Sequence, residues 1–151
     1  SVAENQIVFS VGGRVLASRL IDGQFPNYKQ LIPDEFEHDI RLSTEEIAAV
    51  VKRISLLAPP RAPLRLAFSD GELTISAKTP EIGEAQETLP VPFSGEAFEI
   101  GFNPEFLRDG FESVGSDEIV LRLITPLRPG LLEGADGGGL RYLLMPIRIE
   151  T

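Results

Sequence analysis

The chain repeats one pattern, in which a short strand leads into a helix N-cap and an amphipathic helix, and further strands follow. In the first copy, a strand expected at Asp39–Leu42 runs into Ser43, and Glu46 three positions later completes the signature of a capping box. In the second copy, the strand is expected at Phe98–Phe102, and Asn103 is the N-cap. This doubled order constrains the fold strongly, because both copies have to bury their apolar faces in a common core.

Each expected helix carries an apolar stripe at helical spacing. The stripes are Ile47, Val50, Val51 and Ile54 in the first helix, and Phe106, Leu107, Phe111 and Val114 in the second. Pro59-Pro60 should end the first helix. Three strands are expected after each helix: Leu64–Ser69, Glu72–Lys78 and Glu84–Phe93, then Glu118–Thr125, Gly130–Glu133 and Leu140–Ile149. The order predicts an α+β fold, a pseudo-symmetric doubled βαβββ domain with two helices on antiparallel sheet.

The N-terminal part predicts a β-hairpin followed by a connector. Apolar residues alternate over residues 7–11, Gly12-Gly13 supplies a two-residue turn, and the return strand is expected to run through Ile21. An isolated hairpin is marginal in water, so it should pack on the rest of this chain or on a part that is absent. Residues 22–33 are rich in turn formers yet apolar, which is typical of a connector that packs down. Because the chain lacks an initiator Met and begins close to a strand, we expect a truncated start.

Composition excludes several classes of function. The 151 residues contain no cysteine, which excludes a disulfide scaffold, a zinc-thiolate site and thiol catalysis, and is compatible with a reducing cytoplasm. No apolar run approaches the roughly 20 residues of a membrane helix. The formal net charge of −9 is unusual for a nucleic-acid binder, but its distribution matters more than its sum. No basic residue lies between Lys78 and Arg108, where six carboxylates fall: Glu81, Glu84, Glu87, Glu96, Glu99 and Glu105.

The residues capable of catalysis form no recognisable constellation. His38 is the only histidine and is expected in a polar surface loop, so neither a metal nor any other cofactor is predicted. Gly137-Gly138-Gly139 lacks the Lys-Ser/Thr of a phosphate loop and predicts a hairpin tip. A carboxylate hydrolase stays open as a third class, and it requires paired acids of raised pKa in a deep pocket.

Three surfaces invite a functional interpretation. A helical wheel puts Leu56 opposite the apolar stripe of the first helix. Together with its neighbour Leu57 it marks a subunit contact, or it is an incidental exposed leucine. The acidic stretch is a solvated rim or an edge that meets a basic partner. The apolar C-terminal run Tyr142–Ile149 contains Pro146, which favours an edge strand. With the connector, this run could form a groove for an extended peptide, or it could serve packing alone.

Four segments together resemble the bacterial sliding clamp, the beta subunit of DNA polymerase III, in order and spacing over essentially the whole chain. They are Ser18–Tyr28 (SRLIDGQFPNY), Gly83–Glu87 (GEAQE), Ile100–Asn103 (IGFN) and Leu144–Ile149 (LMPIRI). The resemblance implies the DNA-clamp fold, with residues 1–32 as the truncated C-terminal hairpin and connector of a middle domain and residues 33–151 as a complete third domain. In this family, subunits of three similar domains close head to tail into a ring around duplex DNA.

The resemblance also implies three sets of site residues. The peptide groove would contain Pro26, Gln30, Leu31, Asn103, Phe106, Leu143, Met145, Pro146, Arg148 and Ile149. The DNA-facing cations would be Lys52, Arg53 and Arg108, and the subunit contact would contain Leu56, Leu57, Glu84 and Glu87. The chain departs from the family where members often carry Arg at Gln30 and Tyr at Phe106, and where Glu150 and Thr151 follow Ile149.

These expectations define a non-enzymatic processivity factor that tethers a polymerase to its template. Its expected partners are the DNA polymerase III alpha subunit, the clamp loader and repair polymerases, all bound through short peptide motifs. Duplex DNA would be bound without base readout, and a second subunit head to tail. The alternative is a standalone clamp-like module that binds peptides or pairs through Leu56 or the acidic edge and never encircles DNA.

Overall fold

A computed structural model describes residues 1–58, 62–79 and 83–149, arranged as two compact units, Ser1–Gln30 and Leu31–Thr151. The helix stop expected at Pro59-Pro60, the rim residue Glu81, and the last two residues, Glu150 and Thr151, lie outside the described residues. No helix in the described part of the chain is long and apolar enough to cross a membrane. The predicted assignment of residues 1–32 and 33–151 to two clamp domains stays a prediction.

The first unit is a hairpin with a short tail. Strands β1 (Gln6–Val11) and β2 (Arg14–Arg19) pair antiparallel. The turn glycines have φ of 55° and 76°, the left-handed values that a type I′ turn needs. The predicted extension of the return strand to Ile21 is wrong, because β2 ends at Arg19 and Ile21 is 95% exposed. A single 3-10 turn, η1 (Tyr28–Gln30), ends the unit.

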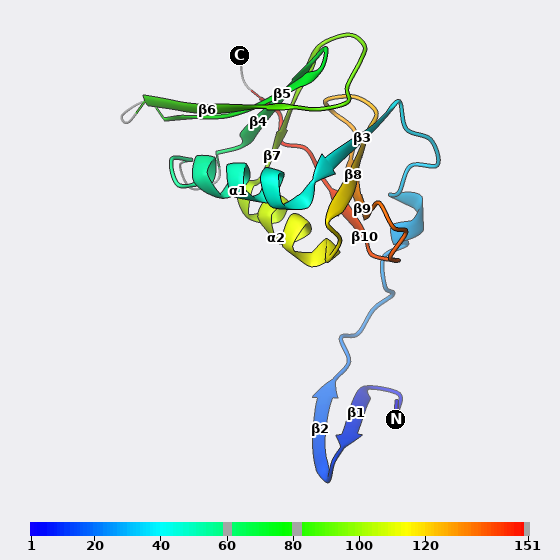
Figure 1. Cartoon of the computed structure of the whole chain (residues 1–151). Coiled ribbons are helices and arrows are strands. Elements are labelled where there is room, and N and C mark those ends of the chain that lie inside the picture. The colour runs from blue at the N-terminus through cyan, green and yellow to red at the C-terminus, as the bar shows by residue number, and fades with distance from the viewer. Residues whose placement is uncertain (59–61, 80–82, 150–151) are drawn as a thin grey trace. The chain divides into compact units, whose positions relative to one another are not determined.

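The second unit contains both copies of the repeated pattern (Figure 1). The first copy is β3 (His38–Ser43), α1 (Thr44–Ser55), β4 (Leu64–Ser69), β5 (Glu72–Thr79) and β6 (Gly83–Pro90). The second copy is β7 (Phe98–Phe102), α2 (Pro104–Val114), β8 (Glu118–Leu123), β9 (Gly130–Gly134) and β10 (Arg141–Leu144). The doubled βαβββ order predicted from the sequence is therefore confirmed.

The two copies exchange their first strands. One antiparallel sheet has the order β6-β5-β4-β7, so three strands of the first copy pair with the first strand of the second. The other sheet has the order β10-β9-β8-β3, in which β3 of the first copy pairs with β8 along its whole length. Neither copy can complete a sheet alone, which makes the unit one structure rather than two.

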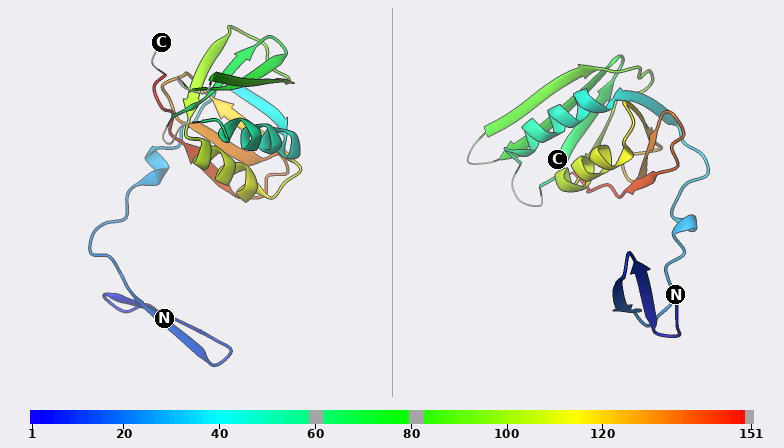
Figure 2. Two further views of the ribbon diagram at one scale, coloured as in Figure 1. Left: turned by 90° about the vertical axis from the view of Figure 1, so that its left-hand side faces the viewer. Right: turned by 60° about the horizontal axis from the view of Figure 1, so that its bottom comes forward.

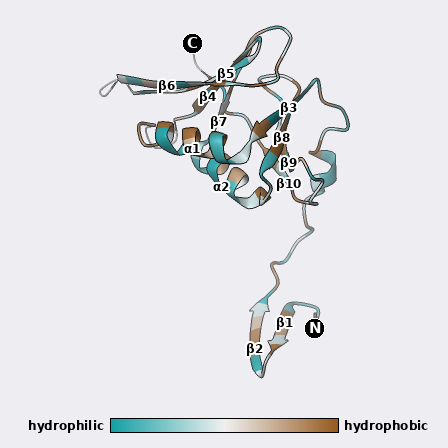
Figure 3. Cartoon of the chain, in the orientation of Figure 1, coloured by the Kyte–Doolittle hydropathy of each residue, from teal (hydrophilic) through white to brown (hydrophobic). Residues whose placement is uncertain are grey.

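Helices α1 and α2 lie side by side against the sheets (Figure 2). Both begin at the predicted caps: Ser43 Oγ accepts from Glu46 N at 3.4 Å, and Asn103 Oδ1 accepts from Glu105 N at 2.8 Å. Each helix alternates hydrophilic and hydrophobic positions along its length (Figure 3). The buried helix residues are Ile47, Val50, Val51, Ile54, Leu107, Gly110 and Phe111. Phe106 is 54% exposed, so its place in the predicted apolar stripe is wrong.

Several details of the strands differ from the prediction. Strand β8 ends at Leu123 rather than Thr125. The last strand ends at Leu144 rather than Ile149, and the segment after it makes only an isolated bridge to β7. Strand β6 ends at Pro90 rather than Phe93. Strand β9 ends at Gly134 rather than Glu133 and is an inner strand, with Gly130, Leu131 and Leu132 buried. Three consecutive buried residues give no period-2 alternation for a sequence pattern to detect.

The expectation for His38 is also wrong. This residue starts β3 rather than lying in a surface loop, and its ring packs among phenylalanines. The His38 centroid lies 5.1 Å from that of Phe93 and 5.2 Å from that of Phe98. Its role is therefore packing at one end of the core, where the aromatic body of the imidazole is covered.

Candidate functional site

The C-terminal segment docks on the edge of β7. Ile147 N donates to Gly101 O at 2.8 Å, in an isolated antiparallel bridge. A Cβ on Gly101 would lie 2.7 Å from Ile147 O and 2.9 Å from Ile149 Cγ1, so only glycine permits this approach. Figure 1 shows the segment, in red, running from β10 along β7. Gly101 thus determines where the last residues of the described chain lie.

The N-cap of α2, Asn103, lies two residues after Gly101 of this bridge. Asn103 Oδ1 accepts hydrogen bonds from Glu105 N and Phe106 N, so the carboxamide oxygen of Asn103 is engaged in capping. Because the bridge is antiparallel, the residues after Gly101 lie on the same side of it as the residues before Ile147. Asn103 and Met145 are each two residues from the bridge on that side. Phe106, on the first turn of α2, is 54% exposed, and Met145 is 62% exposed.

A second glycine fixes α2 on the sheet. A Cβ on Gly110 would lie 2.9 Å from Leu132 Cδ1 and 2.9 Å from Tyr142 Cδ1, so the helix rests directly on β9 and β10. Burial raises the pKa of the Tyr142 phenol, and the negative charge of Asp109 raises it further. The phenol therefore stays neutral at physiological pH and acts as a packing surface under α2.

The structure brings most of the predicted groove residues into one region. Residues of the α2 start and of the C-terminal segment converge through the bridge between Gly101 and Ile147: Asn103, Phe106, Leu143, Met145, Pro146, Arg148 and Ile149. Leu31 belongs to the second unit and is 54% exposed. Pro26 and Gln30 belong to the first unit, and Tyr28 N donates to Pro26 O there.

A second surface lies where α1 ends beside β6. Leu56 is the C-cap of α1 and is 82% exposed, as the helical wheel predicted. Thr79 Oγ1 donates to Leu57 O at 2.7 Å and ties this helix end to β5. Glu84 lies on β6, the outer strand of its sheet, opposite Lys78 of β5.

Arg53 and Glu87, which the resemblance assigns to different surfaces, form one ion pair. Arg53 Nε donates to Glu87 Oε1 at 2.8 Å, and Arg53 Nη2 donates to Glu87 Oε2 at 2.7 Å. The hydrogen bonds from Arg53 hold the pKa of the Glu87 carboxyl below its ordinary value, and those to Glu87 raise the pKa of Arg53. A general acid needs the opposite displacement, which argues against Glu87 in a carboxylate hydrolase.

The helix layer carries few uncompensated cations. Arg53 is paired as above, and Arg108 Nη2 lies 3.3 Å from Asp109 Oδ1. Lys52 is exposed and makes no ion pair within the described residues. Five helix carboxylates accompany these three cations: Glu45, Glu46, Glu105, Asp109 and Glu112. Within the described residues, no group of three or more His, Asp or Glu side chains is placed to hold a metal ion.

The comparison with known proteins decides the family. The family profile of the DNA polymerase III beta subunit, C-terminal domain, matches residues 29–148. The chain belongs to the DNA polymerase III beta subunit family. It is 32% identical over 151 residues to a beta sliding clamp of Synechococcus elongatus, covering 98% of this chain and 40% of that protein. A beta sliding clamp of Streptomyces coelicolor is 34% identical over 153 residues, covering 97% of this chain and 41% of that protein. The chain thus spans about 40% of the length of these curated relatives.

Solved structures of beta subunits confirm the predicted clamp fold. The sliding clamp of Bartonella birtlesii matches with a TM-score of 0.91 and 31% identity, covering 98% of this chain and 43% of that chain. The clamp of the same organism bound to griselimycin matches with a TM-score of 0.92 and 31% identity, covering 98% of this chain and 40% of that chain. The resemblance predicted from four sequence segments is therefore confirmed.

Sequence reasoning missed the two glycines that position this region of the beta subunit. Gly101 lies inside a strand pattern and Gly110 inside a helix pattern, where glycine is intrinsically unfavourable. Such a glycine indicates close approach of another backbone or side chain. That signal was available, but the sequence does not tell which segment makes the approach.

Proposed function

We propose that this chain is the C-terminal portion of a non-catalytic processivity factor of DNA replication. In its whole form, this cytoplasmic factor would close a ring around duplex DNA and tether a polymerase to it. The observation that carries the proposal is the docking of the C-terminal segment on β7 beside the start of α2, in a chain whose relatives are beta sliding clamps.

The region around Met145 is proposed as a peptide groove. Its exposed apolar side chains, Phe106 and Met145, flank backbone that is fixed by the bridge between Gly101 and Ile147. Exposed apolar residues beside fixed backbone suit an extended apolar peptide, since the groove loses little conformational freedom when the peptide binds. The occupants would be short motifs of the DNA polymerase III alpha subunit, the clamp loader and repair polymerases. A related clamp has been solved with griselimycin bound, which supports a ligand site in this family.

Titration with griselimycin tests the groove. We expect amide shifts among residues 101–106 and 142–149 of the ¹⁵N-labelled chain. We also expect about tenfold weaker binding in Met145→Ala, because the ligand would cover the Met145 side chain and the truncation removes those contacts. The control is Leu140→Ala, which removes a 39% exposed leucine outside the predicted groove. The groove assignment fails if Met145 and Phe106 stay silent in a folded chain, or if both variants bind alike.

The surface at the end of α1 is proposed as the head-to-tail subunit contact. It would contain Leu56, Leu57, Glu84 and Glu87 beside the outer strand β6. An exposed leucine pair next to carboxylates suits a partner surface that is apolar at its centre and basic around it. That partner surface would belong to a first domain of the second subunit.

Lys52, Arg53 and Arg108 are proposed to face DNA through its phosphates. Such contacts are independent of sequence and sensitive to salt, as a sliding protein requires. One observation favours the second candidate, a standalone module that never encircles DNA. The two helices carry more carboxylates than cations, and two of the three cations are already paired with carboxylates.

Fluorescence anisotropy with duplex DNA separates the two candidates. A DNA-facing helix layer predicts weak binding that falls steeply between about 50 mM and 200 mM salt and weakens in Lys52→Gln. The control is Lys78→Gln, which removes a cation from β5. Absence of binding at low salt, or equal effects of the two substitutions, would favour the standalone module.

A further inference from the structure

The sheet β10-β9-β8-β3 has a hollow on the face that points away from the core. On β8, Ile119, Leu121 and Leu123 belong to the core cluster, so Val120 and Arg122, which alternate with them, point to the opposite face. A pocket of about 350 Å³ lies there, with Val120 in its lining. The pocket is separate from the proposed groove, subunit contact and DNA-facing surface, because it shares no residue with them.

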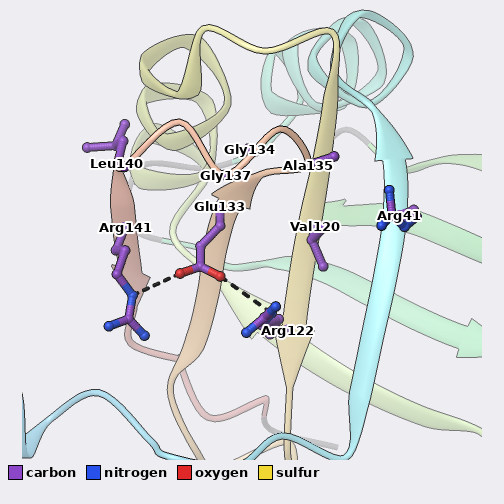
Figure 4. Close-up of a pocket in the computed structure, with 10 residues that line it drawn as sticks. Arg41, Val120, Arg122, Glu133, Gly134, Ala135, Gly137, Leu140 and Arg141 are labelled. Carbon is purple, nitrogen blue, oxygen red and sulfur yellow. Dashed lines mark hydrogen bonds and ion pairs between the residues drawn. The ribbon is translucent and has the colours of Figure 1, made fainter.

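Three arginines from three different strands line this pocket. The strand registers put Arg141 of β10 opposite Glu133 of β9, Glu133 opposite Val120, and Val120 opposite Arg41 of β3. Arg122 lies two residues further along β8. Figure 4 shows Glu133 between Arg141 and Arg122, with Val120 and Arg41 on the neighbouring strands. Arg122 and Arg141 thus flank the Glu133 carboxylate, and Arg41 lies two strands away from Glu133 in the same lining.

The existing ion pairs leave most of these donors free. Glu133 Oε1 accepts from Arg141 Nε at 2.8 Å, and Glu133 Oε2 lies 3.4 Å from Arg122 Nε. Arg41 uses only Nη1, toward Glu118. Within the described residues, no hydrogen bond engages the terminal amino groups of Arg122 or Arg141. A guanidinium has five donors in a planar fork, so the cluster retains capacity for a further anion.

Arg122 is also held in position before any ligand arrives. Its Cζ lies 5.8 Å from the centroid of the Phe36 ring, and its Nε lies 3.5 Å from Asp39 Oδ1. The Nε atom is buried without a directed hydrogen bond. A guanidinium fixed by an aromatic ring and two carboxylates loses little further freedom when it binds an anion. Exposed ion pairs add little to stability, so fold stability alone does not account for this arrangement.

We propose that this pocket binds the phosphate group of a small phosphorylated molecule. The three arginines of the pocket keep N–H donors that make no hydrogen bond in the described part of the chain, and a phosphate group would accept from them in exchange with Asp39, Glu118 and Glu133, the carboxylates that now pair with these arginines. The volume of about 350 Å³ leaves room for an organic part beside the phosphate. Val120, Ala135 and Leu140 in the lining favour an apolar body for that part.

Two phosphate probes at low ionic strength test this proposal on the ¹⁵N-labelled chain. We expect saturable shifts at Gly134, Gly137 and Gly139, which line the pocket, with phenyl phosphate binding more tightly than inorganic phosphate. A preference for the ester identifies a phosphorylated molecule rather than free phosphate as the ligand. Phenol at the same concentration should leave these amides unshifted.

Charge variants with opposite expected signs make the test decisive. Arg122→Gln and Arg141→Gln should each weaken binding of phenyl phosphate about tenfold, because each removes a charge-assisted hydrogen-bond donor. Glu133→Gln should tighten it about threefold, because a competing carboxylate is lost. Arg65→Gln, a control on β4 in the other sheet, should bind like the unaltered chain.

Several results would overturn the proposal. These are the absence of saturation, shifts spread evenly over all basic residues, equal effects of Arg141→Gln and Arg65→Gln, or weaker binding in Glu133→Gln. Tighter binding of inorganic phosphate than of phenyl phosphate would also overturn it. If Arg122→Gln fails to fold, Arg141→Gln and Glu133→Gln still decide, because Arg141 lies at the exposed start of an outer strand.

Discussion

At the scale of single residues, Gly101 is the position on which the C-terminal segment depends. In Gly101→Ala the new Cβ would lie 2.7 Å from Ile147 O, a backbone atom that cannot rotate away. We expect a loss of about 1–3 kcal/mol in the free energy of unfolding, or release of residues 145–149 from β7. Chemical denaturation measures the first outcome, and hydrogen exchange of the Ile147 amide measures the second.

The control for Gly101→Ala is Gly138→Ala in the turn between β9 and β10. There the new Cβ would meet only the exposed Asp136 side chain, with Oδ1 at 3.1 Å, and this side chain can move. We expect a change within about 0.5 kcal/mol. Equal stability and equal Ile147 exchange in both variants would show that the segment does not depend on the close approach at Gly101.

The ion pair between Arg53 and Glu87 predicts a pH dependence with a definite sign. The pKa of Glu87 is lowered in the folded chain, so the pair stabilises the fold above the carboxyl's unfolded pKa. That contribution is lost as the pH falls through the lowered folded value. We expect the Glu87 carboxyl to titrate below its ordinary value in a ¹³C NMR titration, and to move upward in Arg53→Gln. The control is Arg65→Gln, which leaves this pair intact and should leave the titration midpoint of Glu87 unchanged. An unchanged midpoint in Arg53→Gln would contradict the pairing.

At the scale of elements, the contact of α2 with the sheet opposes helix propensity. Replacing a mid-helix glycine by alanine normally stabilises a helix by up to about 1 kcal/mol. At Gly110 the new methyl would lie 2.9 Å from atoms of both Leu132 and Tyr142. We expect Gly110→Ala to destabilise the fold by about 1–3 kcal/mol instead, because overpacking outweighs propensity. Urea denaturation with a far-UV circular dichroism readout measures this difference.

A double-mutant cycle assigns that cost to the contact. Tyr142→Leu removes the ring that the new methyl would meet, so Gly110→Ala should cost less in that background. Additive effects would mean that the cost arises from the contact with Leu132 or from another source rather than from Tyr142. Stabilisation by Gly110→Ala alone would mean that the helix can move off the sheet without penalty.

Local chemistry explains which elements the sequence could predict. The strand bounds at Leu64–Ser69 and Phe98–Phe102 are confirmed without change, because apolar residues alternate there and caps or turns follow. The end of the C-terminal strand was predicted five residues too far along the chain, at Ile149 instead of Leu144. Its apolar residues continue past Leu144, but Pro146 has no N–H for a ladder. Propensity cannot indicate that only Ile147 then pairs with Gly101, because that contact is long-range.

The same limit applies to the sites. The helical wheel correctly predicted that Leu56 is exposed, because helical geometry is local. The pairing of Arg53 with Glu87 depends on how α1 packs over β6, and no sequence pattern encodes that packing. Likewise Arg41, Arg122 and Arg141 lie far apart in the sequence and meet only through the registers of three strand pairs. Register depends on the whole core, so this pocket could not be predicted from spacing.

At the scale of the whole molecule, the exchange of first strands joins the two βαβββ copies. Strand β3 pairs along β8, and β7 pairs along β4, so each sheet needs strands from both copies. The buried core likewise draws residues from both. A copy taken alone would leave the hydrogen-bonding edge of a strand unpaired, and its helix would lose contact with the helix of the other copy. The second unit should therefore unfold as one cooperative transition.

Cutting the chain between the copies tests this dependence. A protease site inserted between Ser94 and Gly95, in the exposed loop before β7, would yield two fragments after cleavage. We expect the fragments to remain associated, to unfold when separated, and to regain their circular dichroism on mixing. Because unfolding would then release two chains, Tm should rise with protein concentration. A site inserted at Gly12-Gly13, in the hairpin of the first unit, is the control, since cleavage there leaves the second unit in one piece and its Tm independent of concentration. Fragments that fold separately, or a concentration-independent Tm after the Ser94 cut, would show that the strand exchange is dispensable.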